Sequence, residues 1–122
     1  MNQVIESPRV ALHADVSGQS WEGRRVTIVG LGRSGLAAAR LLLRAGARVR
    51  ITESRQSPHL QSARDELLRE GLAEAELGGH TRQCVAATDI VVVSPGVPEH
   101  AGPIPWALAA GIPIISEIEL GF

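Results

Sequence analysis

Apolar residues along this chain change between two kinds of spacing from about residue 23 onwards. Short, continuous runs of apolar and β-branched residues, as at 26–29 and 90–93, are typical of strands that are buried on both faces. Between such runs, apolar residues recur at every third or fourth position, as on the buried face of a helix. Regular alternation of these patterns predicts a parallel sheet with helices on both faces.

We therefore expect an α/β fold, a Rossmann-like doubly wound sheet of about five parallel strands. The expected strands cover residues 25–29, 48–52, 73–77, 90–93 and 112–116. The expected helices cover residues 34–45, about 60–70 and 104–110, with a further short helix within 81–87. The third strand should lie at an edge of the sheet, because glutamates alternate with its apolar residues. Gly46 should end the first helix in the left-handed conformation.

A glycine-rich segment follows the first predicted strand and opens the first predicted helix. Its spacing is Gly-x-Gly-x-x-Gly, in which Gly30 permits a tight turn, Gly32 lets the backbone approach a phosphate and Gly35 allows close packing of helix on strand. The second predicted strand leads into Glu53, where nucleotide-binding sheets of this type carry an acidic residue for a ribose or base. This context favours a nucleotide phosphate loop over a turn with only a structural role.

Three side chains in or near this segment could contact a ligand, and the sequence favours that role to a different degree for each. The Ser34 hydroxyl could contact a phosphate oxygen or cap the first helix, and the sequence does not choose between these roles. Arg33 could pair with a phosphate, although an arginine in an exposed loop is more often only solvated. For Glu53 a ligand contact is favoured, because ligands of open parallel sheets bind at the carboxyl ends of the strands.

Two further segments follow later strands. Ser94-Pro95-Gly96 could be an ordinary turn, since proline and glycine are common after strands. Its position beside the glycine segment favours a role as the opposite wall of a phosphate cleft. Glu117 and Glu119, near the end of the chain, are two positions apart, and we expect them to be solvated surface charges.

Length and composition limit the class of protein. The 122 residues suit one domain over 23–122, preceded by a loosely ordered extension over 1–22. That extension does not have the pattern of a signal peptide, and no apolar run is long enough to span a membrane. A net charge of −1, with two tryptophans and one phenylalanine as the only aromatic residues, argues against a nucleic-acid partner. We expect a soluble protein without membrane or nucleic-acid partners.

Individual residue types narrow the chemistry further. Cys84 is the only cysteine, so no intramolecular disulfide can form, and a cytoplasmic location with a buried thiol is the simplest expectation. The four histidines lack the spacing of metal ligands, and no metal site is expected. All 12 basic residues are arginine, which excludes a Walker A loop and a Schiff-base lysine from this sequence.

Four segments together resemble the amino-terminal domain of the Mur ligases, most closely those that add D-glutamate. They are residues 30–35 (Gly-Leu-Gly-Arg-Ser-Gly), 52–55 (Thr-Glu-Ser-Arg), 94–97 (Ser-Pro-Gly-Val) and 116–120 (Ser-Glu-Ile-Glu-Leu). The resemblance covers about residues 22–122, and the segments follow the order of the family. The sequence departs from the family pattern at Glu53, where aspartate is frequent, and in its amino-terminal extension.

The resemblance implies substrate binding rather than catalysis. In these ligases the amino-terminal domain holds the UDP end of UDP-N-acetylmuramoyl-L-alanine, a central domain binds ATP with Mg²⁺, and a carboxyl-terminal domain helps to bind the amino acid. Carried over by motif, the diphosphate would be held by Leu31, Gly32, Arg33, Ser34 and Gly35, the uridine by Glu53, Ser54 and Arg55, and the phosphates would be bordered by Ser94, Pro95 and Gly96.

On this resemblance, the chain is a piece of a three-domain, ATP-dependent enzyme of peptidoglycan synthesis, which forms an acyl phosphate and then an amide bond. The piece alone should hold no catalytic residue and no cofactor, should bind UDP weakly and should be a monomer. Two alternatives stay open from the residues: an NAD(P)-binding module of an oxidoreductase, and a nucleotide-sensing regulatory domain.

Overall fold

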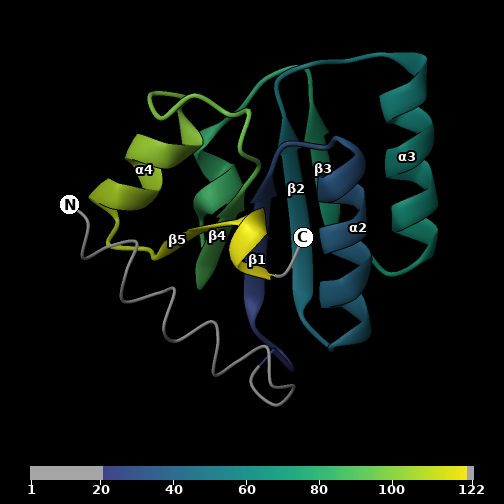
Figure 1. Cartoon of the computed structure of the whole chain (residues 1–122), viewed down its shortest axis with the longest axis horizontal. Coiled ribbons are helices and arrows are strands. Elements are labelled where there is room, and N and C mark those ends of the chain that lie inside the picture. Colours follow the sequence, from purple (N-terminus) through teal and green to yellow (C-terminus); the bar gives the residue numbers. More distant parts are fainter. Residues whose placement is uncertain (1–20, 121–122) are drawn as a thin grey trace.

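The computed structural model describes residues 21–120, which form a five-stranded parallel sheet (Figure 1). Its strands are β1 (Arg25–Val29), β2 (Arg48–Glu53), β3 (Glu74–Leu77), β4 (Ile90–Val93) and β5 (Ile114–Ser116). They lie in the order β3-β2-β1-β4-β5, and each neighbouring pair is parallel. The predicted fold class and the edge position of the third strand are confirmed.

Helices connect these strands and follow the last one. Within the described residues they are α2 (Arg33–Arg44), α3 (Pro58–Arg69), α4 (Pro103–Ala109) and the 3₁₀ helices η1 (Arg82–Val85) and η2 (Glu117–Leu120). Only η2 was not predicted. Local signals set the helix ends: Ser57 accepts the Leu60 N–H at 3.1 Å at the start of α3, and Gly46 follows α2 with a left-handed φ of +90°. None of these described helices is long and apolar enough to cross a membrane.

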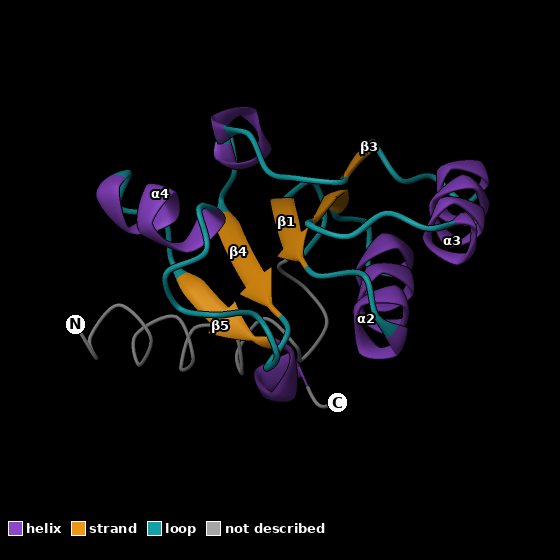
Figure 2. Cartoon of the chain, turned by 90° about the horizontal axis from the view of Figure 1, so that it is seen from above, coloured by secondary structure: helices purple, strands orange, loops and turns teal. Residues whose placement is uncertain are grey.

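The helices cover both faces of the sheet, α2 and α3 on one side and α4 with η1 on the other (Figure 2). Side chains of β1 alternate accordingly. Val26 and Ile28 belong to the core that includes α2 and α3 residues, whereas Val29 packs with Ala107 of α4. The chain reverses its direction across the sheet between β1 and β4, so the loops that follow these two strands diverge and leave a crevice at their carboxyl ends.

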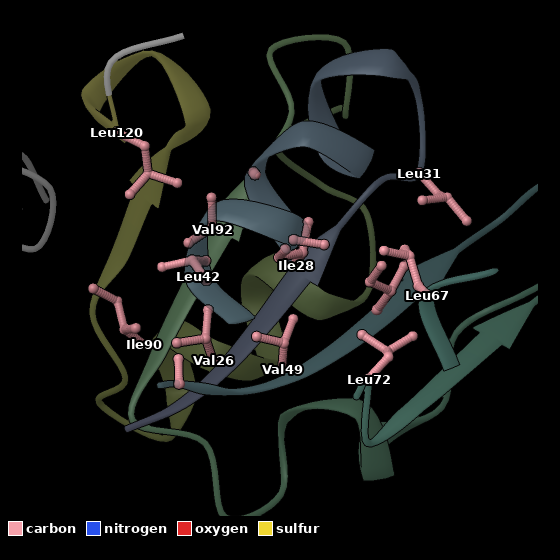
Figure 3. Packing of buried hydrophobic residues seen from close by; sticks show 14 of the residues in the cluster. Val26, Ile28, Leu31, Leu42, Val49, Leu67, Leu72, Ile90, Val92 and Leu120 are labelled. Carbon is pink, nitrogen blue, oxygen red and sulfur yellow. The ribbon is translucent and has the colours of Figure 1, made fainter. Parts of the chain in front are cut away.

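The larger core lies between the sheet and the α2–α3 layer (Figure 3). Ile28, Leu42 and Val92 are fully buried there, and burial of a side chain of this size contributes roughly 1.5–3 kcal/mol. Trp21 belongs to the same core and is 4% exposed. The indole of Trp21, two residues before the predicted domain boundary at residue 23, is thus packed within the core. Residues 1–20 of the predicted extension lie outside the described residues.

Polar contacts fix η1 against the opposite face of the sheet. Thr27 on β1 donates its hydroxyl proton to the Cys84 carbonyl oxygen at 2.8 Å, and Arg50 on β2 donates to the Gln83 carbonyl oxygen at 2.9 Å. Cys84 is buried, as predicted. Burial, followed by the nearby Glu76 charge, raises the pKa of its thiol to about 11, so the group is a neutral, packed thiol at physiological pH.

Candidate functional site

A cleft of about 660 Å³ opens at the carboxyl ends of the strands, across the crevice between β1 and β4. The predicted site residues that line it are Gly32, Ser34, Glu53, Ser54, Arg55, Ser94, Pro95 and Gly96. Sequence reasoning did not include the lining residues His80, His100, Ala101 and Gly102. The fold thus brings together the loops after β1, β2 and β4, as their positions predicted, and adds the turn after β3.

The glycines of the segment after β1 have distinct structural reasons. Gly30 has a φ of +107°, and a Cβ there would lie 2.7 Å from Oγ of Ser94. A Cβ on Gly35 would lie 2.4 Å from the Gly30 carbonyl oxygen, which confirms the predicted close packing of helix on strand. At Gly32 a Cβ would meet no atom within 4 Å, so the space beside this backbone is open.

The first turn of α2 presents backbone N–H groups at this edge of the sheet. Gly32 is the residue before the helix, and no side chain caps it. The first N–H groups of an α-helix, here those from Arg33 onwards, have no partner within the helix, and together with the helix dipole they favour an anion. Ser34 does not cap α2, so one of its two predicted roles is wrong.

Glu53 is buried, with 4% exposed, and supports the glycine segment. Its carboxylate accepts hydrogen bonds from the Leu31 N–H at 2.7 Å, the Arg55 N–H at 2.8 Å and the Arg55 Nε at 3.0 Å. Burial alone would raise the pKa of Glu53, but the Arg55 side chain and the two N–H groups outweigh burial and lower the pKa to about 2. Because Glu53 holds the Leu31 N–H, that group is not available to a phosphate. The predicted contact of Glu53 with a ligand stays a prediction.

Glu117 is the residue that sequence reasoning misjudged. The side chain was expected to be a solvated surface charge, but it is only 1% exposed. Its carboxylate accepts the hydroxyl proton of Ser34 at 2.5 Å and that of Ser94 at 2.9 Å. These two hydrogen bonds join the segments that follow β1, β4 and β5 beside the cleft.

The expectation for Glu117 and Glu119 failed because a 3₁₀ helix follows β5 and turns their side chains back toward the sheet. Glu119 is half-buried and accepts the Ser116 N–H at 3.0 Å. A positional signal was nevertheless present. Glu117 comes directly after an apolar strand, at the same edge of the sheet where Glu53 ends β2.

Three predicted residues do not line the main cleft. Leu31 and Arg33 line a second cleft, of about 670 Å³, on the α2–α3 side of the glycine segment. Gly35 is buried beneath the segment, against the Gly30 carbonyl oxygen. Within residues 21–120, no group of three or more His, Cys, Asp or Glu side chains is arranged to hold a metal ion.

Sequence relatives cover most of the described region. The chain is 48% identical over 103 residues to the UDP-N-acetylmuramoylalanine–D-glutamate ligase of Desulfosudis oleivorans, an alignment that covers 81% of this chain and 21% of the relative. It is also 48% identical over 103 residues to the ligase of the same name from Frankia casuarinae, covering 84% of this chain and 21% of the relative. The chain therefore spans about a fifth, 21%, of the length of these curated relatives.

Solved structures share the fold at much lower identity. Glutamyl-tRNA reductase from Methanopyrus kandleri superposes with a TM-score of 0.58 at 15% identity, over 90% of this chain and 34% of that one. The dipicolinate synthase A chain from Bacillus subtilis superposes with a TM-score of 0.58 at 19% identity, over 90% of this chain and 42% of that one. These likenesses show the fold alone. The family model "Mur ligase MurD-like, N-terminal domain" matches residues 24–116, which include every loop that lines the main cleft, and the chain belongs to this family of Mur ligase domains.

Proposed function

We propose that this chain binds the uridine diphosphate part of UDP-N-acetylmuramoyl-L-alanine for a Mur ligase that adds D-glutamate. The observation that carries the proposal is the convergence of the loops after β1, β2 and β4 on one cleft inside the family-matched region. The curated relatives are named as ligases of UDP-N-acetylmuramoylalanine and D-glutamate, which supports this choice of substrate.

In the proposed complex the diphosphate lies against the N–H groups of residues 32–35 at the start of α2. The open space at Gly32 supports a close approach of phosphate to the backbone. Residues 94–96 border the phosphates from the other side of the crevice. The uridine lies toward residues 53–55, at the end of β2, because that end of the cleft is next to the glycine segment and away from β4.

The charges around the cleft favour weak binding by this chain alone. Arg55 is already paired with Glu53, at 3.0 Å between Nε and Oε2. Ser34 and Ser94 both direct their hydroxyl protons to Glu117. A diphosphate therefore depends on backbone N–H groups here, and further neutralisation of its charge must come from other parts of the ligase.

Catalysis, in this proposal, belongs to those other parts. Forming an acyl phosphate from ATP requires cations that stabilise the transferring phosphoryl group, typically a lysine and Mg²⁺. The 122 residues contain no lysine. The chain thus acts as a monomeric substrate-binding domain that neither hydrolyses ATP nor joins D-glutamate, and ATP and Mg²⁺ are used by the parent enzyme.

Titration of the ¹⁵N-labelled chain with UDP, UDP-N-acetylmuramoyl-L-alanine and NAD⁺ tests the proposal. Both uridine nucleotides should shift the amide signals of residues 32–35 and 53–55 and those of Ser94 and Gly96, whereas NAD⁺ should leave them in place. Gly71, at the opposite end of the sheet, serves as an internal control. Shifts with NAD⁺ alone would instead favour an oxidoreductase module. Equal responses to nucleotides of every base would favour a nucleotide-sensing domain.

A further inference from the structure

The turn after β3 brings His80 to the wall of the main cleft, although no motif in the sequence indicated it. His80 is half-buried, and its Nδ1 lies 2.5 Å from Oγ1 of Thr52, a fully buried residue of β2 next to Glu53. Within residues 21–120, Nε2 of the same ring has no hydrogen-bond partner. The protein thus holds one ring nitrogen of His80, and the second is unpaired in the wall of a cleft.

The direction of the bond between Thr52 and His80 follows from a third group. Oγ1 of Thr52 also lies 3.3 Å from Oε1 of Glu76, to which it donates. That carboxylate accepts the N–H of Thr81 at 2.9 Å and the Thr81 hydroxyl at 2.8 Å as well. A hydroxyl has one proton, and a charged carboxylate is a stronger acceptor than a neutral imidazole. Thr52 therefore gives its proton to Glu76 and accepts the Nδ1–H of His80.

This direction determines the tautomer of His80. A neutral imidazole carries one N–H, so a hydrogen on Nδ1 leaves a lone pair on Nε2, which is then an acceptor. An ionised phosphate oxygen cannot donate to that lone pair, whereas the N–H and O–H groups of a nucleoside can. The strand order agrees with a nucleoside partner for His80. The strand that precedes it, β3, lies beside β2, at whose end the uridine is proposed to lie, and is separated from β4 by both β2 and β1.

We propose that His80 is a specificity-determining residue of the main cleft, whose Nε2 accepts a hydrogen bond from an N–H or O–H of the nucleoside. The inference rests on the proposed binding of a uridine nucleotide. Uracil offers an imide N–H at N3, whereas N3 of cytosine is itself an acceptor and would face the Nε2 lone pair unfavourably. Ribose hydroxyls are the other donors of the same chemistry. His80 thereby favours uridine over cytidine nucleotides if the base is the donor.

The tautomer can be measured without any ligand. Imidazole ¹⁵N chemical shifts of the full chain, recorded near pH 8 where an ordinary imidazole is neutral, distinguish Nδ1–H from Nε2–H. We expect Nδ1–H for His80, and we expect Thr52→Val to abolish that preference, because valine keeps the shape of threonine without its oxygen. An Nε2–H tautomer in the unchanged chain would overturn the inference, whatever the chain binds.

Binding tests the second half of the inference. His80→Phe keeps a ring but removes both nitrogens, and it should weaken UDP binding about tenfold, as expected for one lost hydrogen bond to a nucleotide. Thr52→Val should also weaken UDP binding, although Thr52 itself does not line the main cleft. His59→Phe is the matched control, because His59 is exposed and lines the second cleft, not the main one. Its UDP affinity should stay within about twofold of the unchanged chain.

Ligand variants identify the donor. Calorimetric titration with UDP, CDP and 2′-deoxy-UDP should show a preference for UDP over CDP that His80→Phe removes, if the base donates. If 2′-deoxy-UDP alone binds more weakly than UDP, the ribose 2′-hydroxyl is the donor to Nε2, which would equally support the role of His80. Unchanged UDP affinity in a folded His80→Phe variant would overturn the inference alone. Absence of UDP binding by the unchanged chain would overturn the proposed function together with it.

Discussion

Ser34 and Glu117 are 83 positions apart in the sequence, yet the serine Oγ donates to the glutamate Oε1 at 2.5 Å. Ser94 donates to the other carboxylate oxygen at 2.9 Å. One buried carboxylate thus ties the segment after β1 to the loop after β4. Because both hydroxyl protons face Glu117, the two serines present lone pairs elsewhere, and an anion in the cleft must depend on backbone N–H groups.

Removal of the Glu117 carboxylate should destabilise the domain. We expect Glu117→Ala to lower the free energy of unfolding by about 2–3 kcal/mol, because two hydroxyls lose a charged acceptor and a buried side chain is deleted. Glu117→Gln keeps one acceptor oxygen and should cost about 1 kcal/mol. Urea unfolding followed by circular dichroism measures both. The exposed Glu99 provides the control, since Glu99→Ala should change stability by less than about 0.5 kcal/mol. A Glu117→Ala variant as stable as the unchanged chain would contradict the role of this carboxylate.

Two glycines of the same segment should separate stability from binding. Gly35→Ala places a Cβ 2.4 Å from a backbone oxygen, which cannot move aside easily, so we expect a loss of about 2–4 kcal/mol in the free energy of unfolding. Gly32→Ala meets open space and should cost less than about 1 kcal/mol, mainly as a poorer residue before a helix. If a phosphate approaches Gly32, this second variant should still weaken UDP binding. Thermal unfolding and UDP titration of both variants test the separation, and similar stability losses in the two would contradict it.

Glu53 should make the stability of the domain depend on pH in the acid range. Its pKa is about 2 in the folded chain against an ordinary value of 4.5, so its stabilising contribution is complete above pH 4.5 and is lost as pH falls toward 2. The contribution is about 2 kcal/mol, reduced from the full linkage value because the Arg55 guanidinium is largely exposed to solvent. Glu53→Gln lacks this contribution. The stability gap between the two proteins should therefore be widest near neutral pH and close as pH falls, and a gap that stays constant would contradict the assignment.

Local patterns were sufficient to predict the strands and α-helices of this fold. The β-branched run at 90–93 predicted a strand, and the glycine spacing at 30–35 predicted a turn that leads into a helix. Both predictions were possible because these local conformations depend mainly on residues that are close in the sequence. The edge strand followed from the alternation of glutamates with apolar residues at 73–77. Parallel strands end at one edge of the sheet, so the meeting of their loops in one cleft followed as well.

Long-range contacts could not be predicted in this way. The burial of Glu117 depends on two serines in distant segments, and the hold of Glu53 on the Leu31 N–H depends on how β2 pairs with β1. The burial of Trp21 could not be predicted either. This single apolar residue has polar neighbours in the sequence and precedes the first strand, so it belongs to no periodic pattern. The position of His80 in the cleft wall could not be predicted, because it lies in a turn after β3 that carries no recognisable motif.

Cys84 should be nearly inert toward thiol reagents in the folded chain. It is the only cysteine, so the reaction reports on this thiol alone. Burial and the nearby Glu76 charge raise its pKa to about 11, which leaves roughly one thiolate in a thousand near pH 8, against about a quarter for an ordinary cysteine. Reaction with a disulfide reagent should thus be at least ~100-fold slower in the native chain than in concentrated guanidinium chloride.

The pH dependence of the native rate separates the raised pKa of Cys84 from simple shielding by the fold. An ordinary thiol that is only shielded would react at a rate that levels off above about pH 9, because nearly all of it is then thiolate. A thiol with a pKa of about 11 should instead react about tenfold faster for each pH unit up to about pH 10, as long as the domain stays folded. Circular dichroism at each pH verifies the fold, and a rate that levels off near pH 9 in the folded chain would contradict the raised pKa.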